Sequence, residues 1–250
     1  MALGAASRLS WRQLCVAAGI GIAYQGARIL VHRVAFSNQT QNFIHVKGNA
    51  EERNIAKPTI ATWNVFGFQA GGNYLYGGCT PFRDRFEQIA QTIREQNPDI
   101  LVLQECFDDK IPEWFIAEFK NDYAHFFIHN GPEKTTLESG LMVLTRCPVK
   151  SYDFTPFTDN TPGIRRGFAT LTFDAAGKTY AIIGTHLISG AEAIRKKQLE
   201  QIRAAAQKLT CEAVILAGDT NINTQNPSEV ANASMDDVLD YYSLPPTCTN

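Results

Sequence analysis

The sequence lacks the short motifs by which several cofactor and metal sites are recognised. Its six cysteines include no C-x-x-C pair, which argues against a zinc site. The glycine-rich stretch GFQAGGNYLYGG contains no G-x-x-x-x-G-K-S/T motif, and no G-x-G-x-x-G opens a helix. We therefore exclude a nucleotide-binding P-loop and a dinucleotide-binding loop, and interpret this stretch as a loop beside a pocket.

The chain also lacks an excess of charge that would identify a partner. Its formal charge is −2 over 250 residues, and the first 50 residues hold five basic and no acidic side chains. The remaining chain is therefore more acidic than the whole and would repel a nucleic-acid backbone unless its basic groups cluster. With 44% hydrophobic residues, the length allows one sizeable core.

The N-terminal region has no uncharged run of the roughly 20 residues that span a bilayer. The uncharged window between Arg12 and Arg28 holds 15 residues. The apolar stretch Leu14–Tyr24 matches the core of a secretory signal, and no A-x-A motif marks a cleavage point. We expect residues 1–34 to anchor the chain to a membrane or direct its secretion. A mitochondrial transit peptide and an N-terminal helix packed on the domain are the alternatives.

The remaining chain is expected to form one folded domain, residues 58–250, after a polar linker at residues 35–57. Hydrophobic periodicity predicts helices at 82–96, 111–120 and 190–208, and strands at 59–65, 100–103, 126–128, 141–144, 168–173, 180–184 and 213–217. These elements do not alternate regularly, so we expect an α/β (α+β) architecture of layers with mixed or antiparallel sheets. The continuous runs DILVLQ and AVILAG predict strands buried on both faces.

Polar side chains occur where four of the predicted strands end. They are Asn64, Glu105, His186, and the pair Asp219 and Asn221. Each has an ordinary alternative as a turn residue, a solvated loop residue or a structural histidine. If neighbouring strands end at the same sheet edge, however, these groups converge in one cleft and form a candidate site.

This set of side chains suits metal-assisted phosphoryl chemistry. Carboxylate and amide oxygens are hard ligands of the kind that Mg²⁺ or Mn²⁺ prefers. Cleavage of a phosphoester needs charge neutralisation, an oriented water and stabilisation of the leaving group. A metal ion, a carboxylate, two amides and a histidine can supply these.

Five motifs, in order, resemble the endonuclease/exonuclease/phosphatase superfamily over residues 58–250. They are TWNV, NPDILVLQE, SGLMVLTRCPV, GTHL and AVILAGDTN. This superfamily includes pancreatic deoxyribonuclease, abasic-site nucleases, inositol-polyphosphate phosphatases and neutral sphingomyelinases. The resemblance implies a four-layered α/β sandwich of the deoxyribonuclease type.

The resemblance also implies a role for each polar strand end. Glu105 would be the principal ligand of Mg²⁺ (or Mn²⁺), with Asn64 beside it. His186 would donate a hydrogen bond to a phosphoryl oxygen, Asp219 would orient or activate the attacking water, and Asn221 would hold the phosphate. The reaction class is then hydrolysis of a phosphodiester.

The sphingomyelinase-like branch looks nearest, on the segments LQECFDD and SGLMVLTRCPVKSYDFTPF. Arg166 matches a basic position of that branch, although a surface arginine before a strand is an equal alternative. We therefore expect a phospholipid head group as substrate, favoured over nucleic acid. A deoxyribonuclease-like or abasic-site nuclease and a catalytically inactive binding module remain the alternatives, and the oligomeric state is open.

One departure from the family pattern concerns the C-terminal region. The family ends with a strand that carries an aspartate, followed by a Ser-Asp-His segment. No Ser-Asp-His occurs here, and no histidine follows His186. We therefore expect the last strands of the sandwich to be missing from this chain and its hydrolytic activity to be reduced.

Overall fold

The computed structural model describes residues 42–68, 80–131, 137–159 and 164–223, and the statements below refer to these residues. The expected targeting segment at residues 1–34, most of the glycine-rich stretch and the C-terminal region lie outside them. Within the described ranges, no helix is long and apolar enough to cross a membrane.

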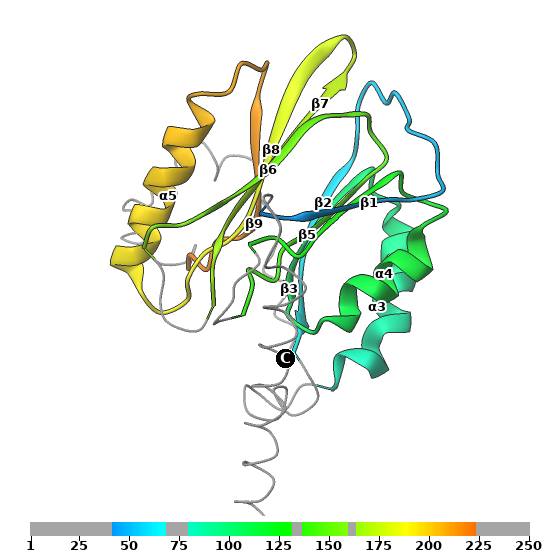
Figure 1. Cartoon of the computed structure of the whole chain (residues 1–250), viewed down its shortest axis with the longest axis horizontal. Helices are drawn as coiled ribbons and strands as arrows, with labels where there is room; N and C mark the ends of the chain where they lie inside the picture. Colours follow the sequence, from blue (N-terminus) through cyan, green and yellow to red (C-terminus); the bar gives the residue numbers. More distant parts are fainter. Residues whose placement is uncertain (1–41, 69–79, 132–136, 160–163, 224–250) are drawn as a thin grey trace, which may run out of the picture.

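The described strands form two sheets that face each other (Figure 1). The first has the order β1 (Ile44–Lys47), β4 (His125–Ile128), β5 (Met142–Thr145), β3 (Ile100–Cys106), β2 (Ile60–Gly67). The second has the order β6 (Val149–Pro156), β7 (Gly167–Ala175), β8 (Lys178–His186), β9 (Val214–Asp219). The pairs β2–β3 and β8–β9 are parallel and the other pairs are antiparallel, which confirms the expected mixed sheets.

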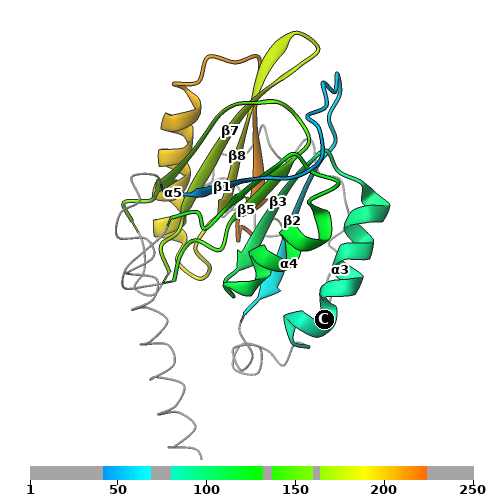
Figure 2. The same ribbon diagram turned by 45° about the vertical axis from the view of Figure 1, so that its right-hand side comes forward.

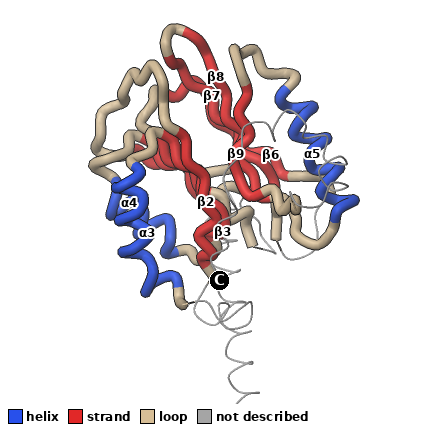
Figure 3. The backbone as a smooth tube through the Cα atoms, turned by 180° about the vertical axis from the view of Figure 1, so that it is seen from behind, coloured by secondary structure: helices blue, strands red, loops and turns tan. Residues whose placement is uncertain are grey.

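Helices cover the outer faces of both sheets, as Figures 2 and 3 show. Helices α3 (Phe82–Gln96) and α4 (Lys110–Phe119) pack against the first sheet, and α5 (Glu192–Ala206) packs against the second. The order helix, sheet, sheet, helix gives the four layers that the family resemblance implied.

Three hydrophobic clusters fill the spaces between these layers, and the two-residue period of the strands assigns side chains to them. In β3, Leu101 and Leu103 face the helices, whereas Ile100 and Val102 face the second sheet. β3 is covered on both faces, which explains why its sequence is a continuous apolar run. The candidate site lies at the space between the two sheets.

Two short or weakly patterned strands were not predicted from periodicity. The expected linker at residues 35–57 is wrong for Ile44–Lys47, which form β1 and pair antiparallel with β4. This strand is only four residues long, so its alternation is hidden within polar sequence. In β6 only Phe154 is buried, because the strand lies at the end of the second sheet's order, and its hydrophobic period is correspondingly weak.

The prediction of burial on both faces fails for the first half of β9. Val214 and Ile215 are each 36% exposed, whereas Ala217 is buried. Within the described residues β9 pairs only with β8.

Candidate active site

The predicted site residues lie where the end strands of the two sheets meet. By the two-residue period, Asn64 in β2 shares a face with Ile60, His186 in β8 with Ile182, and Asp219 in β9 with Ala217. Ile60, Ile182 and Ala217 all belong to the cluster between the sheets. The side chains therefore converge across the two sheets, rather than along the edge of a single sheet.

Glu105 reaches the same space through an unusual backbone conformation. The period of β3 would place Glu105 with Leu101 and Leu103 on the helix side. Instead its φ is +61°, a region that residues other than glycine rarely adopt, and Cys106 takes the helix-facing position. Such local strain is concentrated at functional sites, where it directs a side chain.

A glycine allows β9 to approach β8 closely just before Asp219. Gly218 has a φ of +152°, and a Cβ atom at this position would lie 1.9 Å from the carbonyl oxygen of Thr185. Only glycine fits here without moving the backbone. The Gly-Asp pair of the sequence thus has a steric reason as well as a chemical one.

Asn64 joins the two carboxylates of the site. Its Nδ2 donates to Glu105 Oε1 at 3.0 Å and to Asp219 Oδ2 at 2.8 Å. Its Oδ1 accepts a hydrogen bond from the backbone N–H of Phe66 at 3.1 Å, which fixes the orientation of the amide. Asn64 is therefore a donor that positions both carboxylates, in addition to its expected place beside a metal ion.

The turn after β9 holds Asp219 from the other side. The backbone N–H of Asn221 donates to Asp219 Oδ1 at 2.9 Å, and the Asn221 side chain donates to the carbonyl oxygen of Leu187 at 2.8 Å. The Leu187 N–H in turn donates to the Asp219 carbonyl oxygen. Both oxygens of the Asp219 carboxylate are thereby fixed, and one Asn221 amide hydrogen is directed at the backbone rather than at a ligand.

His186 lies between the two carboxylates. Its Nε2 is 3.8 Å from Glu105 Oε1 and 3.8 Å from Asp219 Oδ2, while its buried Nδ1 has no hydrogen-bond partner among the described residues. Burial and the nearby Arg166 lower the pKa of His186 to about 4, against the opposite influence of Asp219. The imidazole is therefore neutral near pH 7 and carries one N–H.

Arg166 is part of the site and is not the surface arginine that the sequence left open. It is buried, and its guanidinium donates to the carbonyl oxygen of His186 at 3.2 Å. Burial lowers its pKa, and the charges of Glu105 and Asp219 counteract this effect. The structure thus adds one cation to a centre with two carboxylates.

The oxygen atoms of the site suit a hard divalent cation. Burial raises the pKa of Glu105, its hydrogen bond from Asn64 lowers it, and the charge of Asp219 raises it further. Glu105 Oε2 is buried and has no partner in the described part of the chain, so a carboxylate oxygen is left uncompensated. No group of three or more His, Cys, Asp or Glu side chains is placed to hold a metal among the described residues. Mg²⁺ needs fewer, because it is usually bound by one or two carboxylates and retains several waters.

The structure brings together the six side chains that the sequence proposed for the site, but the sequence did not predict the features that orient them. The strained φ of Glu105 has no sequence signature, and the role of Asn64 as a bridge depends on the pairing of distant strands. Gly218 was visible in the motif AVILAGDTN, and its position directly before a polar strand end was the available signal.

Comparison with known proteins places these features in a family. The model of the Endonuclease/Exonuclease/phosphatase family matches residues 61–236, more than half of the chain. Sphingomyelinase C of Listeria ivanovii is 28% identical over 166 residues, which cover 56% of this chain and 50% of that protein. The chain thus spans about half the length of this curated relative.

Two solved structures share the fold. A beta toxin variant from Staphylococcus aureus with bound magnesium ions has a TM-score of 0.57 at 19% identity, covering 70% of each chain. The D. rerio TDP2 complexed with single-strand DNA product has a TM-score of 0.56 at 21% identity, covering 71% of this chain and 64% of that one. The family match, which covers more than half of the chain, shows that the chain belongs to the endonuclease/exonuclease/phosphatase family.

Proposed function

We propose that this chain is a Mg²⁺-dependent phosphodiesterase, with Mn²⁺ as an alternative metal, that acts on a phospholipid head group of the sphingomyelin type. The observation that carries the proposal is the Asn64 amide, which bridges Glu105 and Asp219 across two sheets beside His186. This arrangement concentrates two carboxylates, an imidazole and a guanidinium at one point. Folding alone does not require such a cluster.

Glu105 is the residue best suited to hold the metal, with Asn64 fixing its carboxylate. It is the more buried of the two carboxylates, with 13% of its side chain exposed against 30% for Asp219. When bound, the metal supplies charge neutralisation at the phosphoryl group. The unpartnered Oε2 of Glu105 is the atom available to it.

Asp219 is suited to orient the attacking water, because it is the more exposed carboxylate and both of its oxygens are held in place. The neutral His186 offers an N–H to a phosphoryl oxygen, and the buried Arg166 adds positive charge where negative charge develops. Asn221 retains a second amide hydrogen for a phosphate oxygen while its first holds Leu187.

The choice of a lipid substrate is supported by the similarity to a sphingomyelinase C and by the acidic balance of the domain. The second candidate function is a nuclease, which the fold shared with TDP2 in complex with single-strand DNA product favours. Both reactions break a phosphodiester bond, so the two candidates differ in the substrate and not in the site.

The test compares sphingomyelin vesicles with single-stranded DNA, each with Mg²⁺ and with EDTA in excess. We expect phosphocholine release that depends on the metal and no cleavage of DNA. DNA cleavage without phosphocholine release would instead establish the nuclease. A lack of both reactions, in a folded sample that binds no metal by calorimetry, would leave the non-catalytic binding module.

A pair of glutamate variants makes this test specific to the site. Glu105→Ala should lose metal affinity in calorimetry and lower the hydrolysis rate by at least about a hundredfold. Glu87→Ala is the matched control, because Glu87 is exposed on α3. Equal metal affinity in both variants would rule out Glu105 as the ligand.

A further inference from the structure

A bulge interrupts the parallel pairing of β2 with β3 directly beside the candidate site. The register of the two strands shifts between Asn64 and Gly67. Within this shift, Val65 and Phe66 of β2 lie opposite the single residue Glu105 of β3. Phe66 and Glu105 both have positive φ angles, of +49° and +61°. Strained conformations of this kind persist only where surrounding contacts hold them, so the bulge depends on contacts from outside the two strands.

The side chain of Arg85, on helix α3, makes such contacts. Its Nη1 donates to the carbonyl oxygen of Val65 at 3.1 Å, and its Nη2 donates to that of Phe66 at 2.8 Å. Its Nε donates to the carbonyl oxygen of Thr80 at 2.8 Å, and its guanidinium carbon lies 5.6 Å from the centroid of the Phe82 ring. A bulge disrupts the ladder of backbone hydrogen bonds. Arg85 therefore supplies donors at the point where the ladder between β2 and β3 is interrupted.

The bulge is linked to the catalytic side chains through Phe66. The N–H of Phe66 donates to Asn64 Oδ1 at 3.1 Å, and Asn64 Nδ2 donates to both Glu105 and Asp219. Arg85 and Asn64 thus bind the carbonyl oxygen and the N–H of the same strained residue. A displacement of Phe66 would therefore turn the amide that positions both carboxylates.

Arg85 is expected to act through the backbone rather than through its charge. The charges that shift the pKa of Glu105 are those of Asp219 and Arg166. Each of the three guanidinium nitrogens of Arg85 bonds a different carbonyl oxygen, which requires the planar fork of an arginine. A lysine carries the same charge on a single nitrogen, so Arg85→Lys separates the two roles.

We propose that Arg85 is a positioning residue of the active site, which holds the bulge after Asn64 and thereby the orientation of the Asn64 amide and of Glu105. Substitution of a residue that orients a metal ligand typically changes metal affinity or activity by about tenfold to a hundredfold. The proposal rests on the phosphodiesterase function for its effect on metal binding and rate. Its effect on the backbone is independent of that function.

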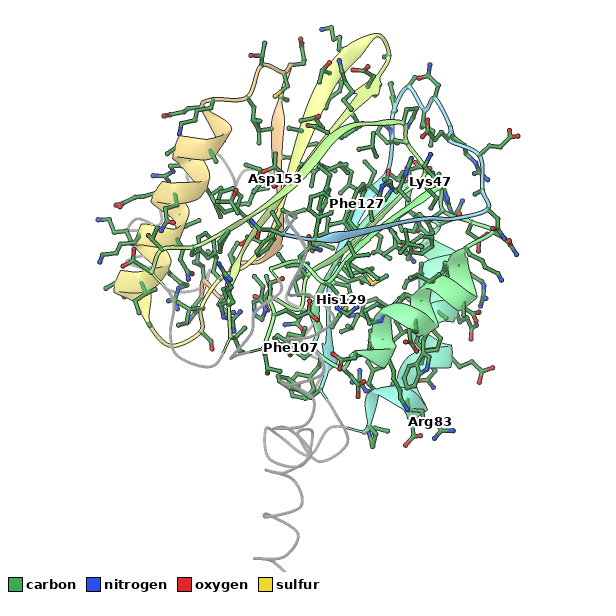
Figure 4. All side chains as sticks on the ribbon, viewed as in Figure 1. Lys47, Arg83, Phe107, Phe127, His129 and Asp153 are labelled. Atoms are coloured by element: carbon green, nitrogen blue, oxygen red, sulfur yellow. The ribbon has the colours of Figure 1, made fainter. Side chains whose placement is uncertain are left out.

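Amide hydrogen exchange of the metal-free chain, in EDTA, tests the effect on the backbone. Arg85→Ala should speed exchange of the Phe66 amide at least about tenfold, while the amides of β8 in the second sheet keep their wild-type protection. Arg85→Lys should also exchange faster than the wild type at Phe66, because one nitrogen cannot reach three carbonyl oxygens. Arg83→Ala is the matched control and should exchange like the wild type, because Arg83 is exposed at the outer end of the same helix (Figure 4).

The proposal is overturned if the Phe66 amide exchanges at the wild-type rate in either Arg85 variant. It is also overturned if exchange increases equally in β8, because Arg85 would then stabilise the whole fold and not the bulge.

Magnesium titration and kinetics test the effect on the site. In calorimetry, Arg85→Ala should weaken Mg²⁺ binding about tenfold, and it should lower kcat about tenfold to a hundredfold with little change in KM for sphingomyelin vesicles. A merely structural role would lower the free energy of unfolding and leave the Mg²⁺ affinity of the folded chain unchanged, which would contradict the proposal. If the wild-type chain neither binds Mg²⁺ nor hydrolyses a phosphodiester, the proposed function fails, and the exchange experiment still decides whether Arg85 holds the bulge.

Discussion

Asn64 Nδ2 lies 2.8 Å from Asp219 Oδ2, a hydrogen bond between residues 155 positions apart in the chain and on different sheets. The same nitrogen reaches Glu105 at 3.0 Å. One amide thus fixes the separation of the two carboxylates that we propose hold the metal ion and orient the attacking water. The geometry of the site therefore depends on how the two sheets pack against each other.

Removal of the Asn64 amide should therefore reduce catalysis more than stability. Asn64→Ala is expected to lower kcat/KM about tenfold to a hundredfold, because a hydrogen bond to a charged group contributes about 1.5–3 kcal/mol. The measurement is metal-dependent phosphodiester hydrolysis. A double-mutant cycle with Asp219→Ala should give a coupling energy of about 1–3 kcal/mol.

The matched control for this cycle is Asn121→Ala, which removes an exposed amide bonded to Asn49. It should leave the rate unchanged and show no coupling to Asp219. Strict additivity of Asn64→Ala and Asp219→Ala would contradict the bridge.

The sequence placed Asn64, His186 and Asp219 at the ends of predicted strands, and the family resemblance grouped them in one site. In the structure, the two-residue period of β2, β8 and β9 turns these three side chains toward the space between the sheets. The helices were predicted to within a few residues from the helical spacing of their apolar side chains, and most strands from short apolar runs.

The remaining features depend on tertiary structure that the sequence does not encode locally. The period of β3 would have turned Glu105 toward the helices, and only its positive φ brings it to the site. The strand order places β2 and β9 at the facing ends of the two sheets, and hydrophobic periodicity does not predict strand order. The burial of Arg166 likewise depends on packing between layers.

Without a bound metal ion, the carboxylate of Glu105 should lower the free energy of unfolding. Burial is the main reason its pKa is raised, so the ionised carboxylate is less favourable in the folded chain than in the unfolded one. Glu105→Gln in the presence of EDTA should raise the free energy of unfolding by about 1 kcal/mol, while it weakens Mg²⁺ binding. Denaturant unfolding and calorimetry measure the two effects. A Gln variant that is less stable than the wild type without metal would contradict this explanation.

Gly218 should tolerate no side chain. Gly218→Ala places a Cβ atom 1.9 Å from the Thr185 carbonyl oxygen, so β9 must move away from β8 and carry Asp219 with it. We expect a loss of about 3 kcal/mol or more in unfolding free energy. Gly177→Ala is the control, because Gly177 has a φ of +76° but open space around it, and should cost only about 1 kcal/mol. Equal losses in the two variants would show that backbone strain alone, and not the contact with Thr185, governs Gly218.

The buried pair of His129 and Glu138 should make stability depend on pH. His129 Nδ1 lies 2.7 Å from Glu138 Oε1, with only 14% and 13% of the two side chains exposed, near Phe107 in Figure 4. Burial alone would lower the pKa of His129, but the hydrogen bond and charge of Glu138, with Asp109 and Glu113, raise it above its ordinary value. The folded chain therefore binds the proton more tightly than the unfolded chain.

Because the pKa of His129 is raised on folding, the pair stabilises the fold fully below the ordinary histidine pKa of 6.5 and less as the pH rises through the folded value. Glu138→Gln should therefore lower the free energy of unfolding by about 2 kcal/mol near pH 6 and by clearly less near pH 9, measured by denaturant unfolding at both values. Glu52→Gln is the control: Glu52 contacts His125 but is 47% exposed, so solvent screens the interaction and the change should be small at either pH. A loss in Glu138→Gln that is equal at the two pH values, or larger at the higher one, would contradict the assignment of a charged His129 to this pair.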